Sequence, residues 1–287
     1  MEDSKIVAVT GSHSGMGYAI LENLLQNTDF RVIMVSRKEK RGEVSLDKLK
    51  SDNPEHAGRV FLEKLDLLDN ESIHSFISRL KDKFGGIDVL VNNASMFVGL
   101  NYENEETIKK EIDTNLINTN YLIEKALESS LINKNGKIIN VSSLLGHIIN
   151  LKSVNSKMHE IMSQSQSFSW SVYEKHLSTY LDEISDFANR KSWPQVYHTT
   201  KMFLSIATYL YSKDERVVER GIQVYSACPG YSINDLMAKK EDLSKVDPEV
   251  IKSGADDISY LINLPFVINP NYQGYHFQKK SLTSLLE

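Results

Sequence analysis

The sequence predicts an α/β fold in which helices cover both faces of a mainly parallel sheet. Short β-rich runs alternate with longer amphipathic segments through the first half of the chain. Strands that alternate with helices in this way are typical of βαβ units and parallel sheets. The short runs are also almost continuously apolar, as strands are when both faces of a sheet are buried. We therefore expect three layers, helix on sheet on helix.

The expected elements follow the chain in order. Strands are expected at residues 5–10, 31–36, 59–66, 87–93, 136–143 and 221–230. The apolar positions between them fit helices at residues 18–27, 72–84 and about 105–131, with a more polar helical stretch after residue 36. In the second helix Ile73, Phe76, Ile77 and Leu80 fall on one face. Residues 149–195 and 231–270 lie outside the alternation.

Composition limits the organisation of the protein and its partners. The chain has 287 residues without an internal repeat or a flexible linker, so we expect one domain over residues 1–287, with a helical insertion at about 150–195. The net charge is −5, which argues against a general nucleic-acid partner and against binding to anionic membranes. A single cysteine, no signal peptide and no apolar run of membrane-spanning length favour a cytoplasmic protein. Histidine spacing fits no metal site.

A glycine-rich turn follows the first expected strand and precedes the first expected helix. In TGSHSGMG, residues 10–17, Gly11 permits a tight turn, Gly15 lets backbone approach a pyrophosphate, and Gly17 permits close packing of helix on strand. The helix N-terminus then offers free N–H groups to phosphate. A purely structural turn also uses glycine, but the position between strand and helix favours dinucleotide binding.

The spacing GxxxGxG resembles that of the short-chain dehydrogenase/reductase family. The resemblance continues with NNAS at residues 92–95, NVSS at 140–143, YHTTK at 197–201 and PG at 229–230. These five motifs stand in the family's order and span most of the chain. The resemblance implies a Rossmann-type doubly wound sheet and a nicotinamide cofactor.

The end of the second strand indicates which cofactor. An acid there binds the adenine ribose of NAD, whereas an arginine accommodates the 2′-phosphate of NADP. Here the strand ends in Ser36 and Arg37, and Arg41 follows, which predicts NADP(H); solvated loop charges are the alternative. The residues expected to bind the cofactor, several of them by family resemblance, are Gly11, His13, Ser14, Gly15, Met16, Gly17, Arg37, Arg41, Asp66, Leu67, Asn93, Ala94, Tyr197, Lys201, Pro229 and Gly230.

The catalytic residues are expected at the YHTTK and NVSS motifs. Tyr197 and Lys201 are four positions apart and share one helix face. Reduction of a carbonyl leaves an alkoxide that needs a proton, which Tyr197 can donate if the Lys201 ammonium lowers its pKa. Ser143, preferred over Ser142 because SLLG matches the family's SxxG, would polarise the carbonyl. By family analogy Asn115 would hold a water that relays protons to Lys201.

Within the family the chain resembles the monomeric carbonyl reductases, through residues 37–43, 85–94 and 192–194 and the long segment before Tyr197. This resemblance implies NADPH-dependent reduction of aldehydes, ketones or quinones. A reductase dedicated to one pteridine, steroid or prostanoid and a cofactor-binding sensor with little turnover are the alternatives. Ser95 and Asn234 depart from the family pattern at the cofactor site, Cys228 lies beside the cofactor loop, and residues 231–240 share little with the relatives.

The insertion also predicts a monomer with a small-molecule carbonyl substrate. Its residues Val172, Leu177, Tyr180, Leu181, Ile184 and Phe187 approximate helical spacing. Such a helix would cover the outer face through which many family members dimerise. An unstructured surface loop is the alternative, but it would leave an apolar stripe exposed.

Overall fold

An eight-stranded sheet runs through the protein, with the strand order β3-β2-β1-β4-β5-β6-β7-β8. The computed structural model describes residues 4–97, 105–143, 169–185, 194–230, 248–265, 276–278 and 281–283. Strands β1 to β7 pair in parallel and β8 pairs antiparallel with β7. The strands are β1 (Ile6–Thr10), β2 (Arg31–Ser36), β3 (Val60–Lys64), β4 (Ile87–Asn92), β5 (Ile132–Val141), β6 (Gln223–Ala227), β7 (His276–Gln278) and β8 (Ser281–Thr283).

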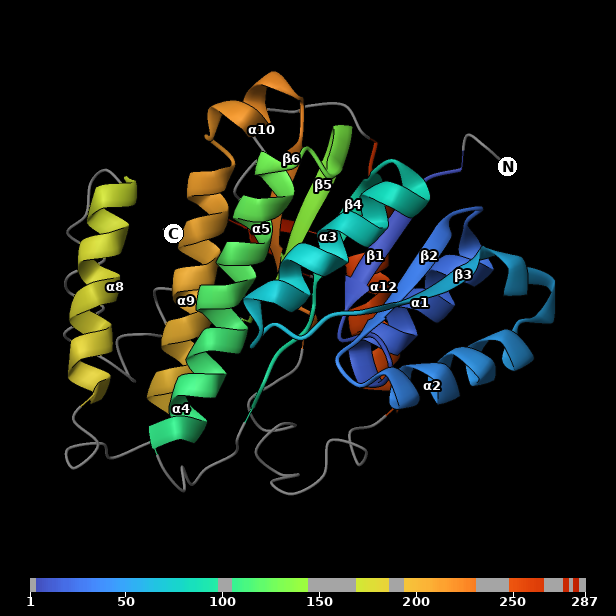
Figure 1. Ribbon diagram of the computed structural model, residues 1–287, viewed down its shortest axis with the longest axis horizontal. Coiled ribbons are helices and arrows are strands. Elements are labelled where there is room, and N and C mark those ends of the chain that lie inside the picture. The colour runs from blue at the N-terminus through green and yellow to red at the C-terminus, as the bar shows by residue number, and fades with distance from the viewer. Residues whose placement is uncertain are drawn as a thin grey trace.

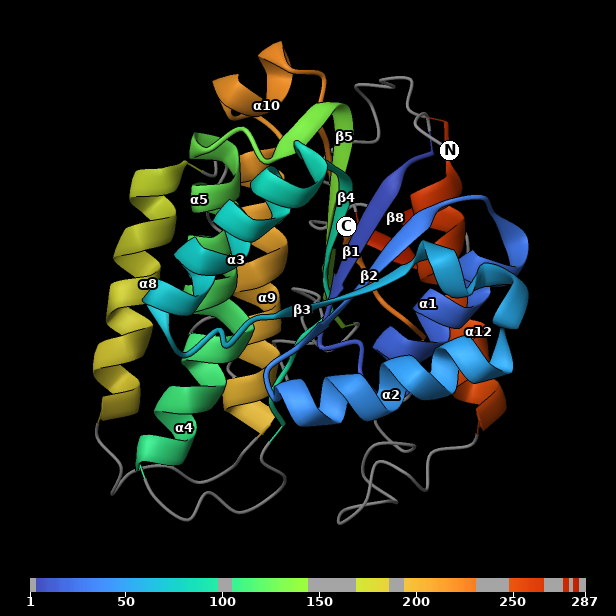
Figure 2. The same cartoon turned by 45° about the vertical axis from the view of Figure 1, so that its right-hand side comes forward.

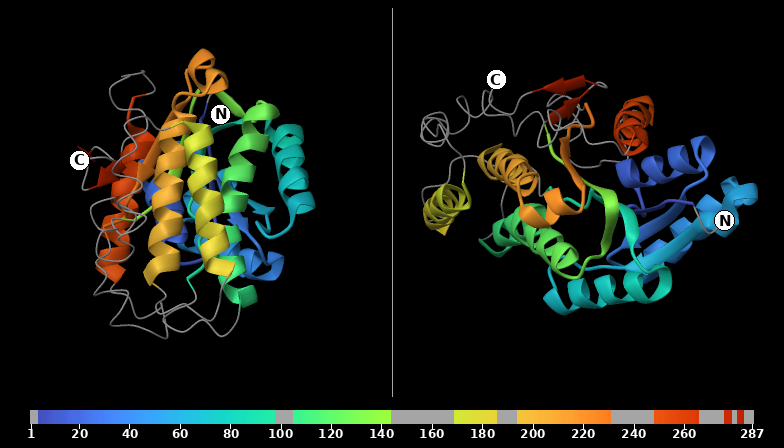
Figure 3. Two further views of the ribbon diagram at one scale, coloured as in Figure 1. Left: turned by 90° about the vertical axis from the view of Figure 1, so that its left-hand side faces the viewer. Right: turned by 90° about the horizontal axis from the view of Figure 1, so that it is seen from above.

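Helices cover both faces of this sheet, which confirms the α/β fold class expected from the sequence (Figure 1). The view from above in Figure 3 separates the layers, with α1 and α12 on one side of the sheet and α3, α5 and α9 on the other. The helices are α1 (Gly15–Asn27), α2 (Glu39–Asp52), α3 (Asn70–Phe84), α4 (Glu105–Ile112), α5 (Asn118–Glu128), α8 (Trp170–Ser185), α9 (Pro194–Tyr211), α10 (Glu215–Glu219) and α12 (Pro248–Asn263).

Two apolar clusters hold the layers together, one on each face of the sheet. Alternate residues of β1 contribute to each: Val7 and Val9 pack with α1 and α12, while Ile6 and Ala8 pack with the helices of the other face. This alternation follows from the two-residue period of a strand. It explains why the parallel strands are apolar at every position, since both of their faces are covered.

The helix expected at 105–131 is interrupted. It forms α4 and α5, joined by a π-helical turn at Asp113–Ile117. The expected helical segment is present over residues 105–128. Its π-helical turn was not expected, because Ile108, Ile112 and Leu116 follow one another at four-residue spacing and are all buried, so the apolar pattern does not mark the turn. π-Helical turns are often found at functional sites, and this one carries Asn115.

A helix is present in the insertion where the apolar spacing predicted one. Helix α8 lies alongside α9 and α5 on the outside of the molecule (Figures 2 and 3). Its residues Tyr173 and Tyr180 are buried, with 3% and 2% of their surface exposed. The flanking residues 144–168 and 186–193, which include Phe187, lie outside the described part of the chain. None of the described helices has the length and apolarity needed to cross a membrane.

Helix α12 is fixed at its C-terminal end by a buried lysine of the sheet. The Nζ atom of Lys137, in β5, donates hydrogen bonds to the carbonyl oxygens of Leu261, Ile262 and Leu264 at 3.1, 2.9 and 2.6 Å. The last carbonyls of a helix have no partners within it and carry a partial negative charge, so a cation there is favourable. The same helix reaches the site described next through Ile251, near its other end.

Candidate active site

The glycine-rich turn between β1 and α1 has the geometry that its sequence predicts. Gly11 and Gly15 adopt positive φ angles of 65° and 56°, in the left-handed region that favours glycine. At Gly17 an added Cβ would lie 2.6 Å from the Cα atom of Ser12, so a side chain there would displace the turn. Local conformation and close packing thus account for these glycines.

The ends of β1 and β4 are bound to each other beside this turn. The Thr10 hydroxyl accepts hydrogen bonds from the backbone N–H groups of Asn93 and Ala94 at 3.0 and 2.9 Å. The Asn93 side-chain amide in turn donates to the Thr10 carbonyl at 2.9 Å. These bonds join the TG and NNA motifs, which are more than 80 residues apart in the sequence.

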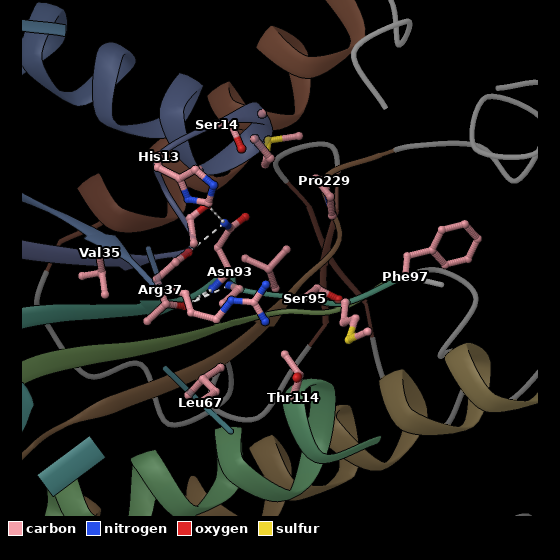
Figure 4. Close-up of a pocket in the computed structure, with 18 of the residues that line it drawn as sticks. His13, Ser14, Val35, Arg37, Leu67, Asn93, Ser95, Phe97, Thr114 and Pro229 are labelled. Atoms are coloured by element: carbon pink, nitrogen blue, oxygen red, sulfur yellow. Dashed lines mark hydrogen bonds between the residues drawn. The ribbon is translucent and has the colours of Figure 1, made fainter. Parts of the chain in front are cut away.

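A cavity of about 480 Å³ opens at this edge of the sheet. It is lined by residues at or after the carboxyl ends of strands β1 to β6, the position at which open parallel sheets bind ligands. Figure 4 shows His13, Arg37 and Asn93 grouped together, with Phe97 well apart from them. The lining residues are Thr10, Gly11, His13, Ser14, Gly15, Met16, Gly17, Val35, Arg37, Leu65, Asp66, Leu67, Asn93, Ala94, Ser95, Met96, Phe97, Thr114, Val141, Ser142, Ser143, Tyr197, Lys201, Cys228, Pro229 and Ile251.

This lining contains most of the site residues expected from the sequence, but Arg41, Asn115 and Gly230 are not part of it. Sequence reasoning did not find Thr10, Met96, Phe97 or Ile251. Thr10 is the first residue of the glycine-rich motif but was given no role, and Met96 directly follows the NNAS motif, whereas nothing in the sequence around Ile251 indicates a site. Asn234 and the rest of residues 231–240 lie outside the described part of the chain. Among the described residues, no group of three or more His, Cys, Asp or Glu side chains is placed to hold a metal ion.

Tyr197 and Lys201 lie together on α9, with the Lys201 Nζ atom 5.6 Å from the centre of the Tyr197 ring. Nζ also donates a hydrogen bond to the Val141 carbonyl at 2.9 Å. Burial lowers the pKa of Lys201 to about 8. Burial raises the pKa of Tyr197, and the electrostatic influence of Cys228 and Glu111 raises it further. This direction is opposite to the one expected from Lys201, because burial of the phenol is the largest influence on its pKa.

The two serines after β5 have different surroundings. The Ser142 hydroxyl donates to the Lys201 carbonyl at 3.0 Å and is hydrogen-bonded to Ser205 Oγ at 2.8 Å. Ser142 therefore ties the end of β5 to α9. Ser143 is the next residue along the cavity wall and is 7% exposed.

Asn115 braces the segment that follows β4. Its Oδ1 atom accepts hydrogen bonds from the Met96 N–H at 2.7 Å and the Ser95 hydroxyl at 3.0 Å, and its Nδ2 atom donates to the Met96 carbonyl at 2.8 Å. The side chain thus fixes the chain where it lines the cavity, and its expected contact with a water stays a prediction. Ser95, which stands where the family has glycine, is accommodated because its hydroxyl bonds to Asn115.

Basic side chains gather beside the glycine turn. Arg37 lines the cavity, whereas Arg41 is exposed on α2. Burial lowers the pKa of His13, and the positive charges of Arg41 and Arg37 lower it further. This group supplies the positive potential that an anionic ligand requires at the end of β2.

A parallel sheet with a glycine turn after its first strand, and a cavity at its carboxyl edge, defines a Rossmann-type nucleotide-binding protein. Residues 5–156 match the model of the short chain dehydrogenase family, and the chain belongs to that family. Carbonyl reductase 1 of Sus scrofa, which is named as an NADPH enzyme, is 28% identical over 92% of this chain and 88% of its own. The (+)-neomenthol dehydrogenase of Capsicum annuum is 24% identical over 98% of this chain and 97% of its own.

The fold is shared with solved structures. The menthone neomenthol reductase of Mentha piperita superposes with a TM-score of 0.77 at 20% identity, over 96% of this chain and 98% of that one. At this level of identity the likeness concerns the fold.

Proposed function

We propose that the protein is an NADPH-dependent oxidoreductase that reduces aldehydes, ketones or quinones to alcohols, with Tyr197 as the proton donor. The observation that carries this proposal is that Ser143, Tyr197 and Lys201 line the same cavity as the glycine turn and Arg37. The names of the relatives support it, since carbonyl reductase 1 of Sus scrofa is named for NADPH and for carbonyl reduction.

The residues around the turn fit a phosphorylated dinucleotide. A Cβ at Gly17 would clash with the backbone of the turn, whereas space is open within 4 Å of the Cβ position of Gly15, so a pyrophosphate can approach there. The Nδ1 atom of His13 is buried without a hydrogen-bond partner among the described residues, as expected of a polar group that awaits a ligand. The remaining expected contacts come from Asp66 and Leu67 at the adenine and from Pro229 and Gly230 at the nicotinamide.

When bound, the cofactor supplies the hydride, and the protein orients the carbonyl and provides the proton. The Ser143 hydroxyl donates a hydrogen bond to the carbonyl oxygen and stabilises the negative charge that develops on it. Tyr197 then transfers its phenolic proton to that oxygen. The ammonium of Lys201 stabilises the resulting phenolate electrostatically. With a pKa of about 8, Lys201 is mostly protonated at neutral pH.

The test measures NADPH and NADH oxidation with a panel of quinones and α-dicarbonyls. Tyr197→Phe keeps the ring, so it should lower kcat by about 100-fold or more and leave NADPH affinity nearly unchanged. Tyr260→Phe, at an exposed position of α12, is the matched control. Arg37→Asp should weaken NADPH binding about 10- to 100-fold with little effect on NADH. Substantial turnover in Tyr197→Phe, or equal affinity of the wild type for both cofactors, contradicts the proposal.

We also propose that the protein is a cytoplasmic monomer. The support for a monomer is that α8 occupies the outer face of α5 and α9 (Figure 3). The support for the compartment is that this sequence has a single cysteine, the buried Cys228, and so forms no disulfide within the chain, as is usual for proteins of reducing compartments.

A further inference from the structure

His13 stands in the glycine turn, with its backbone held by α2 and its side chain at the cavity. Its backbone carbonyl accepts a hydrogen bond from the Ser45 hydroxyl of α2 at 2.7 Å. Its side chain lines the cavity together with Arg37 (Figure 4). The ring is only partly buried, but its Nδ1 atom is shielded from solvent and no described residue hydrogen-bonds it. A buried ring nitrogen without a partner costs free energy unless a ligand or water satisfies it.

The charged groups that face His13 are both cations. Arg37 approaches from the end of β2 and Arg41 from α2. The end of β4 brings the neutral Asn93 (Figure 4), and the turn itself, Thr10–Gly17, carries no other ionisable side chain. Because two positive charges and partial burial oppose protonation, His13 is mainly neutral at pH 7 without ligand.

We propose that His13 is a proton-coupled ligand of the cofactor's 2′-phosphate, which takes up one proton from solvent when a 2′-phosphorylated dinucleotide binds between it and the two arginines. The inference rests on the proposed function, because it needs the 2′-phosphate to occupy this end of the cavity. A phosphate monoester carries about −1.5 to −2 charges at neutral pH. Placed among these three side chains it reverses the local sign of the potential, so the protonated imidazole becomes the favoured form.

The proposal distinguishes His13 from a permanent cation. A lysine or arginine would strengthen phosphate binding equally at pH 6 and pH 8. With His13, affinity for the phosphorylated cofactor increases as pH falls through the interval between the pKa of the free ring and the pKa of the liganded ring. Each unit by which the ligand raises that pKa contributes about tenfold to the affinity. NADH lacks the 2′-phosphate, so its affinity should not follow this dependence.

The experiment measures Kd for NADPH and NADH between pH 5.5 and 8.5 by fluorescence titration. His13→Asn removes the titration, His13→Arg replaces it with a permanent charge, and His56→Asn changes a histidine outside the cavity lining. We expect His13→Asn to bind NADPH about tenfold or more weakly than the wild type at pH 6 and nearly as well at pH 8.5. In His13→Arg the affinity for NADPH should lose the part of its pH dependence that comes from titration of His13. The affinity of His56→Asn should follow that of the wild type at every pH. The ionisation of the phosphate itself also changes with pH, but it is common to all variants and cancels when the Kd of a variant is divided by the Kd of the wild type at the same pH.

A direct readout uses the ring itself. The proton resonance that His13→Asn removes from the spectrum identifies His13, and its titration should move to higher pH with 2′,5′-ADP but not with 5′-AMP. Parallel pH profiles for the wild type and His13→Asn, or an unchanged titration of the His13 resonance, would overturn the inference. If NADPH still binds more tightly than NADH in that case, the proposed function stands alone. If neither cofactor binds, the proposed function itself fails.

Discussion

Truncation of Tyr173 should weaken the packing of α8 on the body of the protein. The Tyr173 ring packs edge-to-face on Trp170 and on Phe203 of α9, each at 5.4 Å between ring centres. Its hydroxyl accepts a hydrogen bond from the Asn120 side chain of α5 at 3.0 Å. Tyr173 therefore contacts both underlying helices, α5 and α9.

These contacts give the size of the expected effect. Loss of a buried aromatic ring costs about 3–5 kcal/mol, and each edge-to-face pair accounts for about 0.5–1.5 kcal/mol of interaction beyond its buried area. Tyr173→Ala should then lower the free energy of unfolding by about 4 kcal/mol. Tyr173→Phe keeps both ring contacts and loses one hydrogen bond, so it should cost about 1 kcal/mol.

Urea unfolding measures these values, and light scattering at micromolar concentration measures assembly. The control is Tyr260→Ala, at a position of α12 that is 42% exposed, where a change of about 0.5 kcal/mol or less is expected. We expect a monomeric wild type and association of Tyr173→Ala, because apolar surface of α9 becomes exposed. Equal stability of Tyr173→Ala and Tyr260→Ala would show that α8 is not held as argued, and a dimeric wild type would refute the covering role of α8.

Three further predictions concern buried polar groups. Burial lowers the pKa of Lys137 to about 7 from 10.5, so the unfolded chain binds more protons between these values. Between pH 7 and pH 9.5 the free energy of unfolding of the wild type, measured in urea, should therefore rise by up to about 3 kcal/mol relative to that of Lys137→Met. A difference between the two proteins that stays constant with pH contradicts this. Glu111→Gln removes a charge that raises the pKa of Tyr197, so the alkaline limb of the pH–rate profile should move to lower pH. Ser143→Ala should reduce kcat about 100-fold or more, whereas Ser142→Ala should mainly cost about 1 kcal/mol of stability; equal kcat values would refute the assignment.

The sequence predicted the central strands and the glycine turn because local chemistry determines them. Continuous apolar runs arise from burial on both faces of a parallel sheet, and Gly11 and Gly15 occupy backbone conformations that other residues rarely adopt. Strands β7 and β8 were not expected. They have three residues each, and their pairing with β6 and with each other defines them, so they present no recognisable periodicity.

Long-range contacts account for most of what was missed at the site. The bond between Ser95 and Asn115 joins a loop to a π-helical turn 20 residues away, and neither residue alone indicates it. Glu111 resembles an ordinary residue of an amphipathic helix in the sequence, yet it is 1% exposed and raises the pKa of Tyr197. Burial and charge environment depend on tertiary packing, which a motif does not encode.

The same limit applies to the choice of cofactor-binding residues around the turn. Arg37 and Arg41 are four residues apart and were given the same role from the sequence, but Arg37 lines the cavity and Arg41 does not. Arg41 still influences the site, because its charge lowers the pKa of His13 more than that of Arg37 does. Arg41 therefore opposes protonation of the free imidazole, and its attraction for a phosphate acts at longer range than that of a residue in the cavity wall. For that reason the two arginines should differ in mutation: loss of Arg37 should weaken NADPH binding more than loss of Arg41, and loss of Arg41 should also raise the pKa of the free His13 ring, which NADPH titrations and the His13 resonance measure.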